Sequence, residues 1–148
     1  MIIVGLGGLG GSVCEMLARV GIGHLTLIDG DVFEPSNLNR QLLCQENLMG
    51  FPKAQAAKDR VKAINSEVMV IHLEEYLDES NLYDRIKDGD VIMDCLDSID
   101  TRFKLQTAAQ NASIPIVSGA IAGVAGQLTT IYPGDKGYEL IYGKKGGN

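Results

Sequence analysis

The segment from Asp29 to Gln41, DGDVFEPSNLNRQ, gathers side chains that could bind a charged ligand. It follows an apolar stretch and brings together carboxylates, amides and the guanidinium group of Arg40. A loop needs polarity only to stay solvated, but this mixture can accept hydrogen bonds from hydroxyl groups and donate them to phosphates. We therefore expect a charged small molecule to bind beside this loop.

A glycine-rich turn near the N-terminus supplies a second part of such a site. Residues 5–10, GLGGLG, match the pattern G-x-G-x-x-G between a strand-like run and a helix-like run. The glycines allow the backbone to approach a phosphate closely, and the helix N-terminus supplies N–H donors. Asp29, at the end of the next apolar run, is placed to accept hydrogen bonds from ribose hydroxyl groups. The combination predicts a nucleotide site, with glycines that merely pack as the alternative.

Two cations and an acid favour a triphosphate over a dinucleotide. A dinucleotide site neutralises its pyrophosphate largely with backbone dipoles, whereas a triphosphate under attack needs cations and a metal ligand. Arg40 and Lys53 follow Asp29 at intervals that could return them to the same pocket. Asp97 could hold Mg²⁺. Taken singly, the three have structural alternatives: a solvated arginine, a lysine at a helix start, and an acid beside a helix N-terminus.

The order of the expected elements explains how these residues would meet. Apolar runs alternate with helical periodicity, which predicts an α/β fold: Rossmann-like and doubly wound, with a mostly parallel sheet and helices on both faces. Ligands bind beyond the carboxyl ends of such strands, where the glycine turn, residues 29–31 and residues 94–97 would lie. The expected strands are residues 1–8, 24–30, 68–73, 90–97, 114–123 and 127–133, and the expected helices are residues 10–21, 52–66, 79–89 and 100–113.

The net charge, the apolar runs and the cysteines of the sequence limit which partners and which cellular compartment can be expected. The net charge of −6 argues against nucleic acid, whose binding relies on dense Lys and Arg. No stretch approaches the ~20 apolar residues of a membrane span, and the N-terminus lacks the basic region of a signal peptide. Cys14, Cys44 and Cys95 form no CxxC pair, so we expect packing roles for them, no zinc in this chain, and a reducing cytoplasm.

Four motifs, in this order, resemble the ThiF/MoeB/HesA family, relatives of the ubiquitin-activating (E1) adenylation domains: GLGGLG, LIDGDVFEPSNLNRQ, GFPKAQAA and DCLDSIDTR. The resemblance covers roughly residues 2–133 and implies an ATP- and Mg²⁺-dependent adenylyltransferase. In the family, the C-terminal glycine carboxylate of a ubiquitin-like sulfur-carrier protein of the ThiS/MoaD type, which ends in Gly-Gly, attacks the α-phosphate, and pyrophosphate leaves. The resemblance places the chain in thiamin or molybdopterin biosynthesis and implies a homodimer when the protein is complete.

The resemblance also implies roles for individual residues. Arg40 and Lys53 contact the phosphates and, with the metal-binding Asp97, form the catalytic set. Asn37 is a further phosphate contact, and Asp31 is a secondary polar contact. Asp29 holds the ribose, and the phosphate turn is lined by Gly5, Gly7, Gly8 and Gly10.

Two features that are common in the family are absent from this sequence. Family members usually carry an arginine-containing helix before the first strand, and many carry CxxC pairs and a later cysteine for thioester or persulfide chemistry. This sequence begins on its first expected strand and has no cysteine after Cys95. We therefore expect a fragment of a longer protein, with an ATP-binding domain over residues 1–133 and a flexible tail or truncated crossover segment over 134–148. An NAD(P)-binding oxidoreductase domain, a catalytically silent E1-like scaffold, and a relative that adenylates a non-protein carboxylate such as a modified tRNA base remain alternatives.

Overall fold

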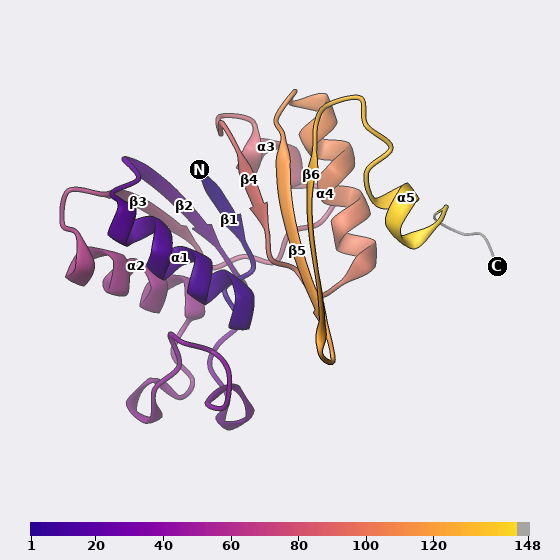
Figure 1. Ribbon diagram of the computed structural model, residues 1–148. Helices are drawn as coiled ribbons and strands as arrows, with labels where there is room; N and C mark the ends of the chain where they lie inside the picture. The colour runs from indigo at the N-terminus through magenta and orange to yellow at the C-terminus, as the bar shows by residue number, and fades with distance from the viewer. Residues whose placement is uncertain (145–148) are drawn as a thin grey trace.

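A six-stranded sheet with helices on both faces forms the centre of the computed structural model, which describes residues 1–144 (Figure 1). The strand order is β3-β2-β1-β4-β5-β6, with β1 to β5 parallel and β6 antiparallel to β5. The strands are β1 (Ile2–Val4), β2 (His24–Ile28), β3 (Met69–Leu73), β4 (Ile92–Asp94), β5 (Ile116–Ala122) and β6 (Ala125–Ile131). The helices are α1 (Gly8–Val20), α2 (Lys53–Ile64), α3 (Leu82–Ile86), α4 (Ile99–Asn111) and α5 (Tyr138–Tyr142), with 3₁₀ turns η1 (Pro35–Asn37) and η2 (Glu46–Leu48).

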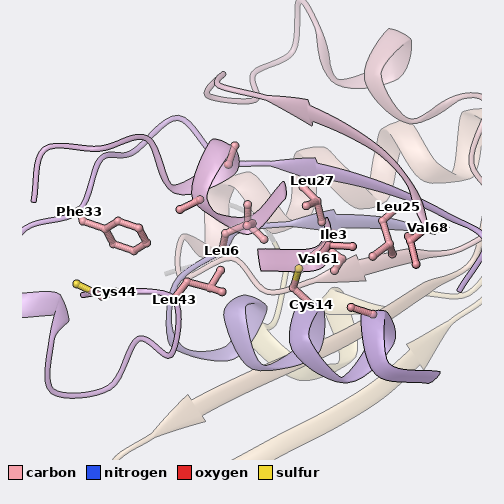
Figure 2. Packing of buried hydrophobic residues seen from close by; sticks show 14 residues of the cluster. Ile3, Leu6, Cys14, Leu25, Leu27, Phe33, Leu43, Cys44, Val61 and Val68 are labelled. Atoms are coloured by element: carbon pink, nitrogen blue, oxygen red, sulfur yellow. The ribbon is translucent and has the colours of Figure 1, made fainter. Parts of the chain in front are cut away.

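The central strand β1 separates two hydrophobic cores. Successive side chains of a strand point to opposite faces, so Ile3 packs toward α1 and α2, while Ile2 and Val4 pack toward α3 and α4. Figure 2 shows Ile3 among the first group, beside Cys14 of α1 and Val61 of α2. The α/β architecture with both faces covered, expected from the alternation of elements, is confirmed.

The topology places a ligand crevice between β1 and β4. From β1 the chain winds outward to β2 and β3, and from β4 it winds the other way to β5. Val4 and Asp94, at the carboxyl ends of β1 and β4, are paired neighbours. The reversal of winding direction leaves a crevice beyond these two ends, and in open α/β sheets ligands bind there.

Close backbone contact explains two glycines of the turn that follows β1. Gly5 has φ +89°, and a Cβ added to it would lie 2.7 Å from the carbonyl oxygen of Cys95. A Cβ added to Gly10 would lie 1.7 Å from the carbonyl oxygen of Gly5. Helix α1 therefore packs directly on the turn, backbone against backbone, which no larger residue allows.

Between β2 and α2 the chain makes a long excursion that carries η1 and η2 and projects from the sheet (Figure 1). Its neck is closed by an antiparallel bridge between Val32 and Pro52. Phe33 donates from its N–H to the Phe51 carbonyl oxygen at 3.0 Å and accepts from the Gly50 N–H at 2.9 Å. The Phe33 side chain is buried and belongs to the same hydrophobic core as Ile3, so it anchors the excursion to the rest of the domain (Figure 2).

A short helix, α5, follows residue 133 and was not predicted from the sequence, which indicated a flexible tail or truncated crossover segment over residues 134–148. The structure describes this segment up to residue 144. Tyr138 of α5 is fully buried, and its ring meets the ring of Phe103 on α4 at 6.0 Å between centroids. A helix of five residues is too short to produce a readable apolar period, which is why the sequence did not reveal it. Within residues 1–144, no helix has the length and apolar character needed to cross a membrane.

Candidate functional site

A cleft of about 990 Å³ lies at the carboxyl ends of β1, β2, β4 and β5. Eight of the ten site residues expected from the sequence line it: Gly5, Gly7, Gly8, Asp29, Asp31, Arg40, Lys53 and Asp97. The two others, Gly10 and Asn37, lie behind its wall. The chain thus brings together residues separated by up to 92 positions in the sequence, Gly5 and Asp97.

Asp29 ties the glycine turn to the loop after β2. Its Oδ2 accepts a hydrogen bond from the Leu6 N–H at 2.7 Å, and its Oδ1 accepts one from the Asp31 N–H at 2.8 Å. Burial raises the pKa of Asp29, and the two N–H donors oppose that shift. A carboxylate has about four lone-pair sites, so the two oxygens can still accept hydrogen bonds from ligand hydroxyl groups.

Lys53 reaches the cleft from the first residue of α2 with most of its side chain buried. Its backbone N–H donates to the Asp31 carbonyl oxygen at 3.0 Å, and its ammonium group lies 6.0 Å from the centroid of the Phe33 ring. The Nζ of Lys53 is 3.8 Å from Oδ2 of Asp31, which is too long for a hydrogen bond. The ammonium group is thus held in place and keeps its donors for a ligand.

Arg40 and Gln41 lie directly beside the glycine turn. A Cβ on Gly8 would be 3.7 Å from Cγ of Arg40, and a Cβ on Gly7 would be 3.5 Å from Nε2 of Gln41. The exposed guanidinium group of Arg40 donates to the Ser36 carbonyl oxygen at 3.1 Å. Gln41 was not predicted as a site residue, although it is the last residue of the polar segment 29–41. It is 6% exposed, and its Oε1 has no hydrogen-bond partner in residues 1–144.

Asn37 and Gly10 support the cleft from outside it. The Oδ1 of Asn37 accepts a hydrogen bond from the Glu34 N–H at 2.9 Å, and the two residues form a capping box around η1. Asn37, expected to contact phosphates, therefore uses this oxygen to shape the loop that presents Arg40. Gly10 was expected in the lining of the turn, but it lies on the inner side, against Gly5.

Asp97 is exposed at the cleft, one residue before the N-cap of α4. The cap itself is Ser98, whose Oγ accepts from the Thr101 N–H at 3.3 Å. Ser98 is therefore the N-cap, and Asp97 lies beside the helix N-terminus, where the alternative of an acid that favours the helix dipole still applies. Residues 1–144 contain no group of three or more His, Cys, Asp and Glu side chains that could hold a metal ion.

Asp94 is a fully buried acid behind the cleft. Its Oδ1 accepts from the Leu96 N–H at 3.0 Å, and its Oδ2 accepts from Oγ of Ser118 at 2.9 Å and from the phenol of Tyr138. Nη1 of Arg102 lies 3.4 Å from the same Oδ2. Burial and the charge of Asp94 raise the pKa of Tyr138, so this phenol is a permanent donor.

Arg102 completes this buried group and was overlooked by the sequence analysis. It is 4% exposed, and its Nε donates to the Leu96 carbonyl oxygen at 3.0 Å. Its Nη1 donates to Oγ of Ser118 at 2.9 Å, and its Nη2 donates to the Gly119 carbonyl oxygen at 2.7 Å. Arg102 therefore joins the loop after β4 to β5.

Cys14 and Cys95 are poorly placed to act as nucleophiles. Burial, with smaller help from neighbouring acids, raises the pKa of Cys14 and of Cys95 to about 12. Both are thiols at neutral pH, and the thiolate is the reactive form. Cys44 is also buried, and Figure 2 shows Cys44 and Cys14 among the core side chains. All three cysteines are free, and packing roles were expected for them.

Comparisons with known proteins agree on one family. The model of the ThiF family matches residues 1–146. The chain is 37% identical over 142 residues to the SAMP-activating enzyme E1 of Haloferax volcanii, covering 96% of this chain and 53% of that protein. It is 36% identical to the molybdopterin-synthase adenylyltransferase of Escherichia coli, covering 95% of this chain and 57% of that protein.

A solved structure gives the same picture. The tRNA N6-threonylcarbamoyladenosine dehydratase TcdA of Escherichia coli, in complex with ATP, aligns with a TM-score of 0.80 and 32% identity. The alignment covers 84% of this chain and 52% of TcdA. The chain thus spans about half the length of the proteins that it resembles.

Proposed function

The chain belongs to the ThiF family, and on this premise we propose that it is the ATP-binding part of an adenylyltransferase. The proposed substrate is the C-terminal glycine carboxylate of a ubiquitin-like sulfur-carrier protein ending in Gly-Gly. A carboxylate oxygen attacks the α-phosphorus of ATP, an acyl–phosphate bond forms, and the bond to the β-phosphate breaks. The products are the acyl-adenylate and pyrophosphate.

The observation that carries this proposal is the gathering of the glycine turn, Asp29, Arg40, Lys53 and Asp97 in one cleft. A carboxylate and a triphosphate repel each other unless cations are held between them. In the proposed arrangement Arg40 and Lys53 supply that charge beside the turn, and Asp29 orients the ribose. The names of the relatives, an adenylyltransferase and an E1 enzyme, support the same reaction class.

We further propose that Asp97 holds Mg²⁺ when ATP is bound. Mg²⁺ in nucleotide sites is commonly held by one or two carboxylates together with substrate phosphates and water. One exposed carboxylate in the cleft fits that ligand set. The ion would neutralise phosphate charge, while Arg40 and Lys53 orient the phosphate chain.

Calorimetry on this chain tests nucleotide choice. We expect saturable binding of Mg-ATP and no binding of NADH in the same buffer. Binding of NADH without binding of ATP would defeat the proposal in favour of an oxidoreductase domain.

Exchange of labelled pyrophosphate into ATP tests the chemistry in the longer protein that carries this chain. We expect exchange with a ThiS- or MoaD-type carrier and none with the same carrier lacking its last glycine. ATP binding without exchange for any carrier would instead indicate a silent scaffold. Exchange with a tRNA substrate alone would indicate a non-protein carboxylate.

The proposal also covers the domain boundaries, the oligomeric state, the compartment and the pathway of the protein. Residues 1–133 would form the ATP-binding domain, and the whole protein would act as a homodimer in the cytoplasm, in thiamin or molybdopterin biosynthesis. The three free cysteines fit a reducing compartment. The net charge of −6 disfavours a nucleic-acid partner.

A further inference from the structure

We propose that Tyr76 is a nucleotide-binding residue whose ring forms the wall against which the base of the bound nucleotide stacks. This inference rests on the proposed function, because it adds a contact to the same ATP site. Tyr76 follows β3, at the edge of the sheet where the other cleft residues lie, and it lines the cleft together with Glu75 and Leu77.

The ring of Tyr76 is fixed on one face and at its tip. A Cβ added to Gly30 would lie 2.7 Å from the ring, so the ring lies directly against the Gly30 backbone. The phenol donates a hydrogen bond to Oδ1 of Asp31. Despite these contacts Tyr76 is 69% exposed. The structure thus holds an aromatic ring in one orientation and leaves a large part of its surface uncovered.

The position of the ring fits a base better than a phosphate or a ribose. The turn at Gly7 and Gly8, with Arg40 beside it, marks the proposed phosphate end of the cleft. Asp29 marks the ribose, and Tyr76 lies against the very next residue, Gly30. The base is attached to the ribose on the side away from the phosphates, which is the part of the site left for Tyr76.

Tyr76 would increase the affinity for the nucleotide because its ring is already ordered before the ligand binds. A ring already held by Gly30 and Asp31 loses little side-chain freedom when a ligand arrives, so more of the stacking energy appears as affinity. Base–aromatic stacking is worth about 1–3 kcal/mol per base. Stacking tolerates different bases, so its loss should weaken nucleotides as a class while leaving a ligand without a base unaffected.

Calorimetry with two ligands separates this role from a structural one. We expect Tyr76→Ala to raise the Kd of Mg-ATP about 5- to 150-fold. The Kd of Mg-tripolyphosphate, which has no base, should stay unchanged. Tyr76→Phe should keep most of the ATP affinity, since the ring remains. Tyr132→Ala is the matched control, because Tyr132 is 61% exposed and lies outside the lining of the cleft.

A fluorescent variant gives a second and independent measurement. The chain contains no tryptophan, so Tyr76→Trp would carry the single indole of the protein. We expect Mg-ATP to change its emission through stacking and Mg-tripolyphosphate to leave it unchanged. In Tyr132→Trp neither ligand should change the emission.

Three results would overturn the inference. Tyr76→Ala with the ATP affinity of the wild type would show that the ring does not touch the base. An equal loss of affinity for both ligands would show that it only braces Asp31. An indole at position 76 that does not respond to bound ATP would contradict stacking. If the wild type binds no ATP, the proposed function fails first, and this contact fails with it.

Discussion

Two charged groups of the cleft differ in how far their hydrogen bonds are satisfied. The first, which we call the closed cluster, consists of Asp94, Arg102, Ser118 and Tyr138. Arg102 and Asp94 are 4% and 0% exposed, and each oxygen of Asp94 accepts from a donor within the protein. Both charges are compensated inside the fold, so this cluster joins β4, β5, α4 and α5 whether or not a ligand is present.

The second group, the open cluster, consists of Asp31, Arg40, Lys53 and Asp97. Its closest ion pair, Lys53 with Asp31, is 3.8 Å long, and Arg40 and Asp97 are exposed. Asp31 accepts a hydrogen bond from the phenol of Tyr76 and Arg40 donates one to the Ser36 carbonyl oxygen, so the protein satisfies these charges only in part and leaves further donors and acceptors for a ligand. The contrast teaches that a charged residue beside a cleft is a candidate ligand contact only when the fold itself leaves it unsatisfied.

The largest expected effect on stability comes from breaking the closed cluster. Arg102→Ala should lower the free energy of unfolding by about 3–5 kcal/mol, because it leaves the buried carboxylate of Asp94 uncompensated. Urea unfolding followed by circular dichroism measures this. Arg40→Ala, on the open side, should change the same free energy by about 0.5 kcal/mol or less. Equal losses in the two variants would remove the distinction between the clusters.

Substitutions in the open cluster should lower the activity and leave the stability of the fold unchanged. Lys53→Met keeps the buried stem of the side chain and removes its charge, so we expect pyrophosphate exchange to fall about 10²–10³-fold. Its melting temperature should not fall, since a buried ammonium group without a hydrogen bond stabilises little. Lys58→Met, on the same helix but outside the cleft lining, is the control. A melting temperature that falls together with activity would make Lys53 a structural residue.

A smaller change within the closed cluster tests how its energy is shared. Tyr138→Phe removes one donor from the carboxylate of Asp94 and keeps the ring packed against Phe103. A hydrogen bond to a charged group contributes about 1.5–3 kcal/mol, so the loss should be below that of Arg102→Ala. Denaturant unfolding of the two variants side by side gives the comparison. A loss for Tyr138→Phe that equals the arginine variant would mean that α5 holds the cluster together.

The smallest effect on stability is expected from a surface salt-bridge network. It gives a reference value with which the effects of the two clusters can be compared. Glu15 of α1 accepts hydrogen bonds from Arg60 of α2 at 2.8 Å and from Arg19 at 2.8 Å. These arginines, Arg60 foremost, lower the pKa of Glu15 from 4.5 to about 2. The unfolded chain therefore takes up this proton first as the pH falls. The resulting stability is present above pH 4.5 and is lost as the pH falls toward 2.

Glu15→Gln measures that contribution directly. We expect it to cost about 1 kcal/mol or less at pH 7, because both arginines are partly exposed. The difference from the wild type should shrink steadily in melts between pH 5 and about pH 2, where the wild-type carboxyl is protonated too. A difference that does not depend on pH would mean that the glutamate contributes by packing alone.

The sequence predicted the glycine turn, the sheet and Asp29 because each of these depends on a local sequence pattern. Glycine spacing, apolar alternation and the acid after β2 each act over a few residues, and they located the turn, the sheet and Asp29. The rule that ligands bind at the carboxyl ends of parallel strands placed Asp97 at the same edge. Arg40 and Lys53 were placed there by their intervals after Asp29 and by the family resemblance.

The sequence could not separate the two clusters, because their difference lies in long-range contacts. Arg102 stands in the quoted segment DCLDSIDTR, but its partners Ser118 and Gly119 are on another strand. Tyr76 follows β3 as Asp29 follows β2, so the same positional rule would have found it. Asn37 was predicted to contact the phosphates, but its side-chain oxygen accepts a hydrogen bond from the Glu34 N–H. The sequence alone does not show whether an amide in a polar loop binds a ligand or the backbone of that loop.

The bridge between Val32 and Pro52 closes the neck of the excursion after β2, and this has an evolutionary consequence. The chain beyond a closed neck can change in length without altering the register of any strand, provided that Leu43 keeps its contact with Gly11 of α1. In the proposed arrangement Arg40 reaches the nucleotide from this segment, so the segment can diverge in sequence while the sheet stays the same.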